Sequence, residues 1–245
     1  MAADWTIQAL GAAKKFAKDY GHDYRVTNKQ LSAPFEVGSF HSLVDFYAQS
    51  AVVKPMNLED GVYKYLTGPG GNPMNFSYVE VNHEGETFEI RQQVRIRSHV
   101  HRDICFTPDL VVLPANAPLF AEVDTDYAGG KRGLWGVSAE YVIAAHECKS
   151  LVPFPELLIG FVGMIVAAHP WVANFATSAE VPEGPHLAPT LFIGGTTQGL
   201  QRKMVAALQK VYPVNIVTGL HFGTWDLFES PVPRRRVATL ASMVS

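Results

Sequence analysis

The sequence predicts an α/β domain in which helices flank a central mixed β-sheet, with an additional N-terminal helical segment. Apolar residues recur at helical spacing within residues 4–50 and 155–211, and segments of strand character lie between these two regions. Hydrophobic residues make up 47% of the 245 positions, which is enough for one large core. We therefore expect a single domain over residues 1–245, with an N-terminal extension at 1–34 and a core at 35–220.

Two helices are expected before the sheet. Trp5 begins a set of apolar residues at helical spacing over residues 4–20, and Gly21 follows where a helix would end. A second helix is predicted over about 35–50, with Pro55 beyond its end. Both helices would have one apolar face.

A pair of strands is predicted after a loop rich in glycine and proline at residues 66–75. The runs at 76–81 and 87–97 have strand character, and residues 82–85 between them are typical of a hairpin turn. Apolar and basic residues alternate along the second run, so one face would be buried and the other would be basic. The basic face would carry Arg91, Arg95 and Arg97, which either line a phosphate track or are simply solvated.

The second half of the chain predicts further strands and helices in alternation. A strand is expected at 103–113, and the following residues 114–138, rich in Pro, Ala and Gly, are expected to form an inserted loop. A buried strand is predicted at 141–149 and a helix at 155–168 that begins near a proline. The remaining expected elements are a strand at 190–193, a helix at 198–211 and a strand at 214–218.

The composition limits the class of protein. The formal net charge of −3 argues against a surface coated with positive charge, so any contact with phosphate must be local. The two cysteines, Cys105 and Cys148, are too few for a disulfide framework and fit a reducing cytoplasm. Residues 1–5 lack the features of a signal peptide, and the apolar run 157–168 is shorter than the roughly 20 residues of a membrane span. We expect no membrane association.

Two short motifs carry the candidate chemistry. Pro108-Asp109 lies in one predicted strand, and Glu147-Cys148-Lys149, the only acid-x-Lys sequence in the chain, ends another. Because side chains alternate along a strand, Glu147 and Lys149 emerge on the same face. Hydrolysis of a phosphodiester adds negative charge to an anionic centre, and hard cations held by carboxylates offset that charge.

These motifs and the order of the predicted elements resemble the PD-(D/E)XK nuclease superfamily, which has the restriction-endonuclease-like fold. The resemblance implies that Asp109 and Glu147 hold Mg²⁺ or Mn²⁺, that the carbonyl of Cys148 can add a ligand, and that Lys149 positions or activates the attacking water. It also implies hydrolysis of phosphodiester bonds in nucleic acid, with DNA favoured over RNA. The interval between Asp109 and Glu147 is long for this pattern, and we assign the excess to the insertion at 114–138.

Other residues leave alternatives open. Asp109 is also compatible with an ordinary turn, and Glu147 with Lys149 is compatible with an ordinary ion pair. Glu36 is either a further metal ligand or an acid that suits the first turn of a helix. Three other groups of polar residues are expected to be structural rather than functional. They are His99 with His101, Asp124 with Asp126, and the turn Gly194-Gly195-Thr196-Thr197.

The expected function has one main alternative. The alternative is a catalytically inactive nuclease-fold module that binds nucleic acid or a partner protein. The modest net charge makes a homodimer or a recruiting protein partner compatible with the sequence. The insertion carries Lys131, Arg132 and Trp135 beside mobile glycines, and we expect it either to contact the substrate or to form a surface hairpin covered by Trp135.

Overall fold

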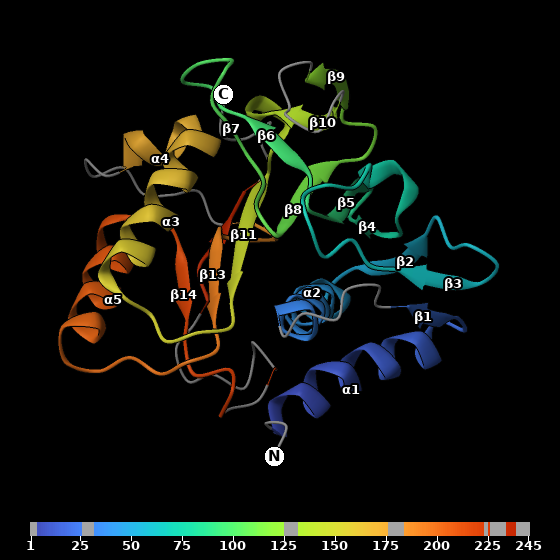
Figure 1. Ribbon diagram of the computed structural model, residues 1–245, viewed down its shortest axis with the longest axis horizontal. Coiled ribbons are helices and arrows are strands. Elements are labelled where there is room, and N and C mark those ends of the chain that lie inside the picture. Colours follow the sequence, from blue (N-terminus) through green and yellow to red (C-terminus); the bar gives the residue numbers. More distant parts are fainter. Residues whose placement is uncertain are drawn as a thin grey trace.

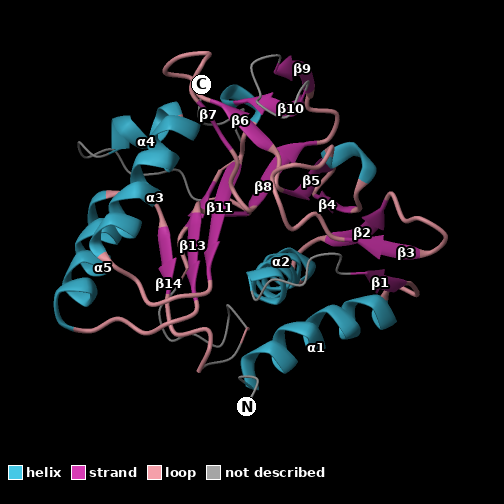
Figure 2. Ribbon diagram, in the orientation of Figure 1, coloured by secondary structure: helices cyan, strands magenta, loops and turns pink. Residues whose placement is uncertain are grey.

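The computed structural model describes residues 4–25, 32–124, 132–175, 184–222, 225 and 234–238. A large β-sheet lies between two groups of helices (Figure 1). The predicted α/β class, with a mixed sheet flanked by helices, is confirmed. Helices α1 (Asp4–Asp19) and α2 (Ser32–Ala48) lie on one side of this sheet, and α3 (Pro155–Ala168), α4 (Pro170–Phe175) and α5 (Gly199–Val211) lie on the other (Figure 2).

The large sheet has seven strands. Strands β11, β13 and β14 run parallel, and the crossovers between them contain α3 and α5, as parallel strands require. The other neighbours are antiparallel. The spatial order is β14 (Asn215–Val217), β13 (Thr190–Ile193), β11 (Ala144–Lys149), β8 (Leu110–Pro114), β5 (Glu86–Gln92), β4 (Tyr78–His83) and β2 (Val52–Met56).

The central strands contribute to two hydrophobic cores, one on each face of the sheet. Along β8, Leu110 and Val112 pack into the core beneath α1 and α2, whereas Val111 and Leu113 pack into the core beneath α3. A strand that is covered on both faces has an unbroken apolar sequence, which is what these four residues provide. Helix α1 packs into the same core as α2 and the large sheet, because its buried Trp5 belongs to that core.

A second sheet, which has four strands, lies at the top of the molecule in Figure 1. Its order is β7 (Cys105–Phe106), β6 (Arg95–Arg97), β10 (Arg132–Ser138) and β9 (Phe120–Asp124). The prediction of an inserted loop at 114–138 is therefore wrong, because β9 and β10 pair as an antiparallel hairpin and β10 adds to β6. The pairing partner β6 is distant in the sequence, and composition alone does not reveal it.

Two predicted strands are each divided between the sheets. The run 87–97 leaves the large sheet after Gln92 and enters the small sheet at Arg95, and the run 103–113 returns through β7 and β8. The first division occurs at Gln93, whose φ of 52° lies in the left-handed region that non-glycine residues rarely adopt. This change of direction places the backbone of Gln93 beside that of Asp109, with a hydrogen bond of 3.0 Å from Gln93 N to Asp109 O.

The expectation that residues 87–97 have one buried face and one basic face is also wrong for Arg91. This side chain is buried, with only 6% of the residue exposed, and its guanidinium pairs with Glu89 and lies over the ring of Tyr78. Arg97 pairs with Glu122 and lies over the ring of Phe120. Two of the three arginines therefore have partners within the fold.

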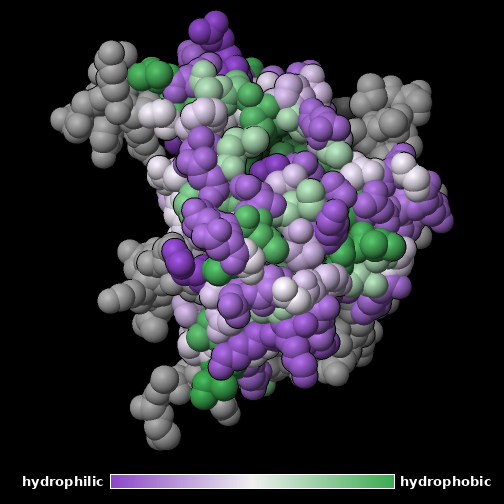
Figure 3. All heavy atoms as spheres, turned by 90° about the vertical axis from the view of Figure 1, so that its right-hand side faces the viewer, coloured by the Kyte–Doolittle hydropathy of each residue, from purple (hydrophilic) through white to green (hydrophobic). Residues whose placement is uncertain are grey.

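Several elements were not predicted. Strand β2 forms one edge of the large sheet and contains Pro55, which was expected to lie beyond a helix. Proline is compatible with an edge strand because its missing N–H can face solvent. The side of the molecule that carries β2 is mainly hydrophilic, with separate hydrophobic areas (Figure 3). The other unpredicted elements are β1 (Asp23–Arg25), β3 (Val62–Lys64), β12 (His186–Leu187), β15 (Arg236–Val237), α4, and 3₁₀ turns at Pro73–Asn75 and Ala139–Tyr141.

Helix α3 begins and ends at the predicted residues, Pro155 and Ala168. Leu158, Phe161 and Ile165 on one side of this helix are buried against the sheet. Among the described helices, none combines the length and the apolar character that are needed to cross a bilayer.

Five histidines are buried among the described residues, and four of them, at positions 41, 146, 169 and 186, are at most 1% exposed. Burial lowers the pKa of His41, His146 and His169 to about 3 and that of His186 to about 4. The unfolded chain binds protons at these positions below about pH 6.5, whereas the folded chain does not. These histidines are buried in the neutral form. The free energy of unfolding is therefore larger above about pH 6.5 and decreases as the pH falls below this value.

We predict that His169→Gln removes one part of this acid sensitivity. Between about pH 6.5 and 4.5, the free energy of unfolding of the native sequence should fall by about 1.4 kcal/mol per pH unit more than that of the variant. Urea denaturation at a series of pH values measures the difference. His101→Gln is the control, because the His101 side chain is 61% exposed. The free energy of unfolding of this variant should change with pH in parallel with that of the native sequence. A parallel curve for His169→Gln would contradict the prediction.

Candidate functional site

Three polar residues lie in a row across the middle strands of the large sheet, just beyond the last paired positions. Strand β5 pairs with β8 as far as Gln92, and β8 pairs with β11 as far as His146. The next positions in this register are Gln93, Asp109 and Glu147. Because opposed residues of antiparallel strands point to the same face, the register brings these three side chains together where the strands separate.

The carboxylate of Asp109 is held from two sides. Gln93 donates a hydrogen bond from Nε2 to Oδ1 at 2.8 Å, and the backbone N–H of Cys148 donates to Oδ2 at 2.7 Å. The residue is only 8% exposed. Asp109 therefore connects β8 to both neighbouring strands through its side chain, which an ordinary turn aspartate at the surface does not do.

The ammonium of Lys149 contacts both candidate carboxylates. Its Nζ lies 3.6 Å from Oδ2 of Asp109 and forms an ion pair with Oε1 of Glu147. The side chain of Lys149 is 34% exposed, compared with 10% for Asp109 and 16% for Glu147. The acid-x-Lys motif thus presents its lysine toward solvent and its glutamate toward the interior.

A third carboxylate comes from helix α2. Glu36 is buried, and its Oε2 accepts a hydrogen bond of 3.3 Å from Nε2 of Gln93. The amide of Gln93 thus joins Glu36 to Asp109. The sequence left open whether Glu36 is a further ligand, and the structure places it in the same cluster as the two motif acids.

Burial opposes the ionisation of all three acids. It raises the pKa of Glu36 to about 8, with a further contribution from the charge of Asp109. It raises the pKa of Glu147 to about 7, again with a contribution from Asp109. Burial also raises the pKa of Asp109, although Lys149 and the Cys148 amide oppose this shift. Without additional positive charge, the cluster does not readily carry three negative charges at neutral pH.

Lys149 supplies the positive charge that the cluster contains. Burial lowers the pKa of its ammonium, but the charges of Asp109 and Glu147 more than reverse this effect, so the pKa lies above its ordinary value. One ammonium beside three carboxylates leaves the ionised cluster negative. Such a cluster favours a hard cation with oxygen ligands.

The donor set fits a divalent cation that retains water ligands. The Oε2 atom of Glu147 is buried and has no hydrogen-bond partner among the described residues. In the part of the chain that the structure describes, no group of three or more His, Cys, Asp and Glu side chains is arranged to hold a metal by itself. Mg²⁺ usually binds proteins through one or two carboxylates and keeps several waters, so two carboxylates such as those of Asp109 and Glu147 would be enough to hold it.

The residues that were expected to be structural do not join this cluster. His99 contacts the carbonyl oxygen of Val166, and His101 lies beside Asp103. The amides of the turn at 194–195 are used within the fold, because Gly194 N donates to Lys149 O and Gly195 N donates to Leu151 O. Asp126 and the side chain of Asp124 lie outside the described residues.

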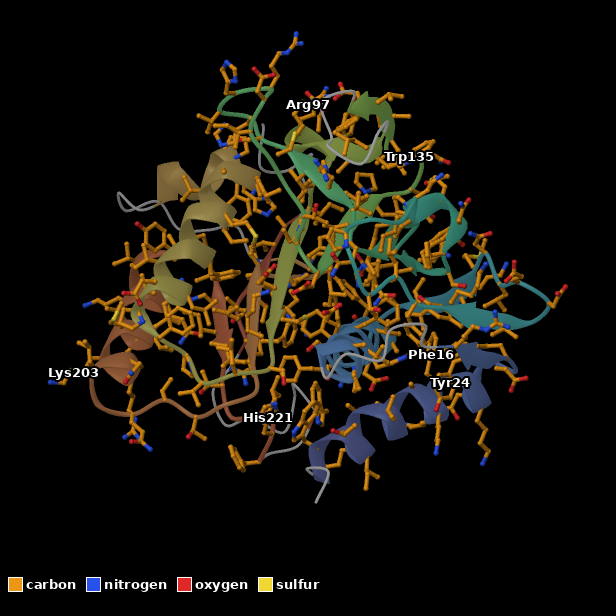
Figure 4. All side chains as sticks on the ribbon, in the orientation of Figure 1. Phe16, Tyr24, Arg97, Trp135, Lys203 and His221 are labelled. Carbon is orange, nitrogen blue, oxygen red and sulfur yellow. The ribbon has the colours of Figure 1, made fainter. Side chains whose placement is uncertain are left out.

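A serine and a histidine meet immediately after the motif. Ser150 Oγ lies 3.1 Å from Nε2 of His221, whose ring stacks on Trp5 with centroids 4.5 Å apart (Figure 4). In the described part of the chain, the imidazole of His221 contacts Ser150 and aromatic rings, and its backbone N–H donates to Gly194 O. Among the described residues, this pair has no carboxylate partner of the kind that orients the imidazole in a hydrolase triad.

Gln93 is the residue of the cluster that sequence reasoning missed. It follows the alternating residues of β5, where the pattern suggested that the strand continues to residue 97. A polar residue at that point gives no sign of a left-handed backbone, since glycine and asparagine are the usual residues there. Its proximity to Asp109 depends on strand pairing and follows from the structure alone.

Comparison of the chain with models of known protein families, with curated proteins and with solved structures finds no match to any of them. The interpretation of the site therefore rests on its own geometry and chemistry.

Proposed function

We propose that this protein is a metal-dependent nuclease of the PD-(D/E)XK type that hydrolyses phosphodiester bonds of nucleic acid, with the restriction-endonuclease-like fold. The observation that carries the proposal is the convergence of Asp109, Glu147 and Lys149 at the point where β8 and β11 separate. The three residues come from two motifs that are far apart in the sequence. An ordinary surface ion pair does not require a buried aspartate held by two strands.

Each residue has a role that its surroundings support. Asp109 and Glu147 would hold Mg²⁺ or Mn²⁺, with the carbonyl of Cys148 as an additional ligand, and the cation would offset the charge that develops on the phosphate. The Lys149 side chain is more exposed than those of Asp109 and Glu147, which supports a role in orienting a water molecule from solvent. Glu36 lies behind Asp109, joined to it through Gln93.

The substrate and partners follow by analogy with the family and remain part of the proposal. DNA is favoured over RNA, and a homodimer or a recruiting protein would supply contacts that a chain of net charge −3 does not provide by itself. Both cysteines are free, Cys105 at the surface and Cys148 in the interior, which is compatible with a cytoplasmic protein.

One observation favours an inactive nuclease-fold module as a second candidate. The ammonium of Lys149 is already paired with two carboxylates, as it would be in a purely structural cluster. Such a module would bind nucleic acid or a partner protein without cleavage. The two functions differ in what the loss of Lys149 does.

We predict that Lys149→Ala lowers the rate of cleavage of DNA in the presence of Mg²⁺ by about 10²–10⁴-fold, because positioned proton transfer contributes this much. Mn²⁺ binding, measured by calorimetry, should persist, because Asp109 and Glu147 remain. Lys203→Ala is the control, since Lys203 is an exposed lysine on α5, at the far left of Figure 4.

The outcomes of this experiment separate the two candidates. Cleavage by the native sequence that EDTA abolishes and Lys149→Ala removes would support the nuclease. Binding of DNA without cleavage, unchanged in Lys149→Ala, would support the inactive module. Equal cleavage by both proteins would remove Lys149 from the proposed mechanism.

A second prediction concerns the hairpin of β9 and β10. Lys131 and the side chain of Arg132 lie outside the described residues, whereas Trp135 is half-buried on the small sheet (Figure 4). Its indole Nε1 would be 3.2 Å from a Cβ added at Gly133, so the ring lies over its own strand. Contact with phosphate would therefore depend on the two cations rather than on this ring.

We predict that Lys131→Ala/Arg132→Ala flattens the slope of log K against log salt for DNA binding by about one unit per lost phosphate contact. Fluorescence anisotropy at several salt concentrations measures this slope. Lys54→Ala, an exposed lysine on β2, should leave the slope unchanged. If the double variant keeps both the affinity and the slope, the hairpin has no contact with the substrate.

A further inference from the structure

Gln93 lies at the junction of the two sheets, and its conformation is fixed from both backbone and side chain. The residue is 6% exposed, its φ is 52°, and its N–H donates to the carbonyl oxygen of Asp109 at 3.0 Å. A left-handed backbone is unfavourable for a residue with a side chain, so the surrounding structure must hold it in place.

The side-chain amide of Gln93 donates to two carboxylates. Its Nε2 lies 2.8 Å from Oδ1 of Asp109 and 3.3 Å from Oε2 of Glu36. An amide nitrogen carries two hydrogens, so each carboxylate can receive one of them. The other oxygen of Asp109 accepts from the Cys148 N–H, which leaves the carboxylate little freedom to rotate.

We propose that Gln93 is a positioning residue that fixes the orientation of Asp109 and keeps Glu36 beside it, so that the cluster is arranged to bind a divalent cation. This inference rests on the proposed function. Partners of this kind, which hold a metal ligand without touching the metal, typically change metal affinity or activity by 10–100-fold when they are removed.

The choice of an amide has a physical reason. A lysine or arginine at this position would add positive charge and compete with the cation for the carboxylates. A glutamate would add a fourth carboxylate and could not donate when ionised. Glutamine supplies two donors without a net charge, which orients the acids and preserves their attraction for a metal.

The neighbouring Gln92 provides a matched control. It is 3% exposed, and neither its Nε2 nor its Oε1 has a hydrogen-bond partner among the described residues. Gln92→Leu and Gln93→Leu therefore remove the same buried amide from adjacent positions. The two substitutions differ in whether the amide contacts the cluster.

The experiment measures Mn²⁺ binding to these variants by isothermal titration calorimetry, without any substrate. Gln93→Leu should weaken the Kd by about 10–100-fold, whereas Gln92→Leu should leave it within about threefold of the native value. Gln93→Gly accepts the left-handed backbone without strain, so it reports the loss of the amide even if leucine prevents folding. Gln93→Asn tolerates the same backbone and keeps an amide, and it should recover part of the affinity.

Crystal structures of the metal-free Gln93→Gly and Gln92→Leu proteins complete the test. The Asp109 carboxylate should turn from its native orientation in Gln93→Gly alone. An Asp109 that stays in place, or native Mn²⁺ affinity in both Gln93 variants that lack the amide, would overturn the inference. If the native protein itself binds no Mn²⁺, the proposed function fails, and the orientation of Asp109 in the metal-free structures decides the role of Gln93 by itself.

Discussion

Three carboxylates beside one ammonium, two of them buried and the third with a side chain only 16% exposed, are the constraint on which the middle of this structure depends. Glu36, Asp109 and Glu147 come from a helix and two strands, and an isolated buried carboxylate is costly. The fold compensates with donors of three kinds: the Lys149 ammonium, the Gln93 amide and a backbone N–H of β11. Each donor is in place only because β5, β8 and β11 keep their register to the point where they separate.

The separation of the strands has its own cause. Between Gln93 and Asp109 the chain leaves the large sheet, forms β6 and β7 of the small sheet, and returns. Gln93 and Asp109, at the two ends of this segment, lie just past the last paired residues of β5 and β8. Their polar side chains therefore face one another and Glu36 of α2. The segment that forms β6 and β7 thus ends the pairing of β5 with β8 at the position of the carboxylate cluster.

Local sequence signals predicted the elements whose structure depends on local residues. Helix α3 follows from Pro155 and its apolar spacing, and β13 follows from a short apolar run between turns. The two motifs also indicated that Asp109, Glu147 and Lys149 belong together. Long-range pairing escaped prediction, as at β9 and β10, where a glycine-rich composition suggested a loop although β6 supplies a partner strand. Arg91 was assigned to the surface for a similar reason, because its partners Glu89 and Tyr78 become visible only in the folded chain.

The edge of the large sheet limits how copies of this chain could associate. An exposed edge strand normally offers a row of backbone donors and acceptors to another strand. Strand β2 remains paired with β4 through Pro55, so the N–H that proline lacks belongs to the outward side, next to the exposed Lys54. The opposite edge, β14, has only three residues. Extension of the large sheet from one molecule into the next is therefore disfavoured at these two edges.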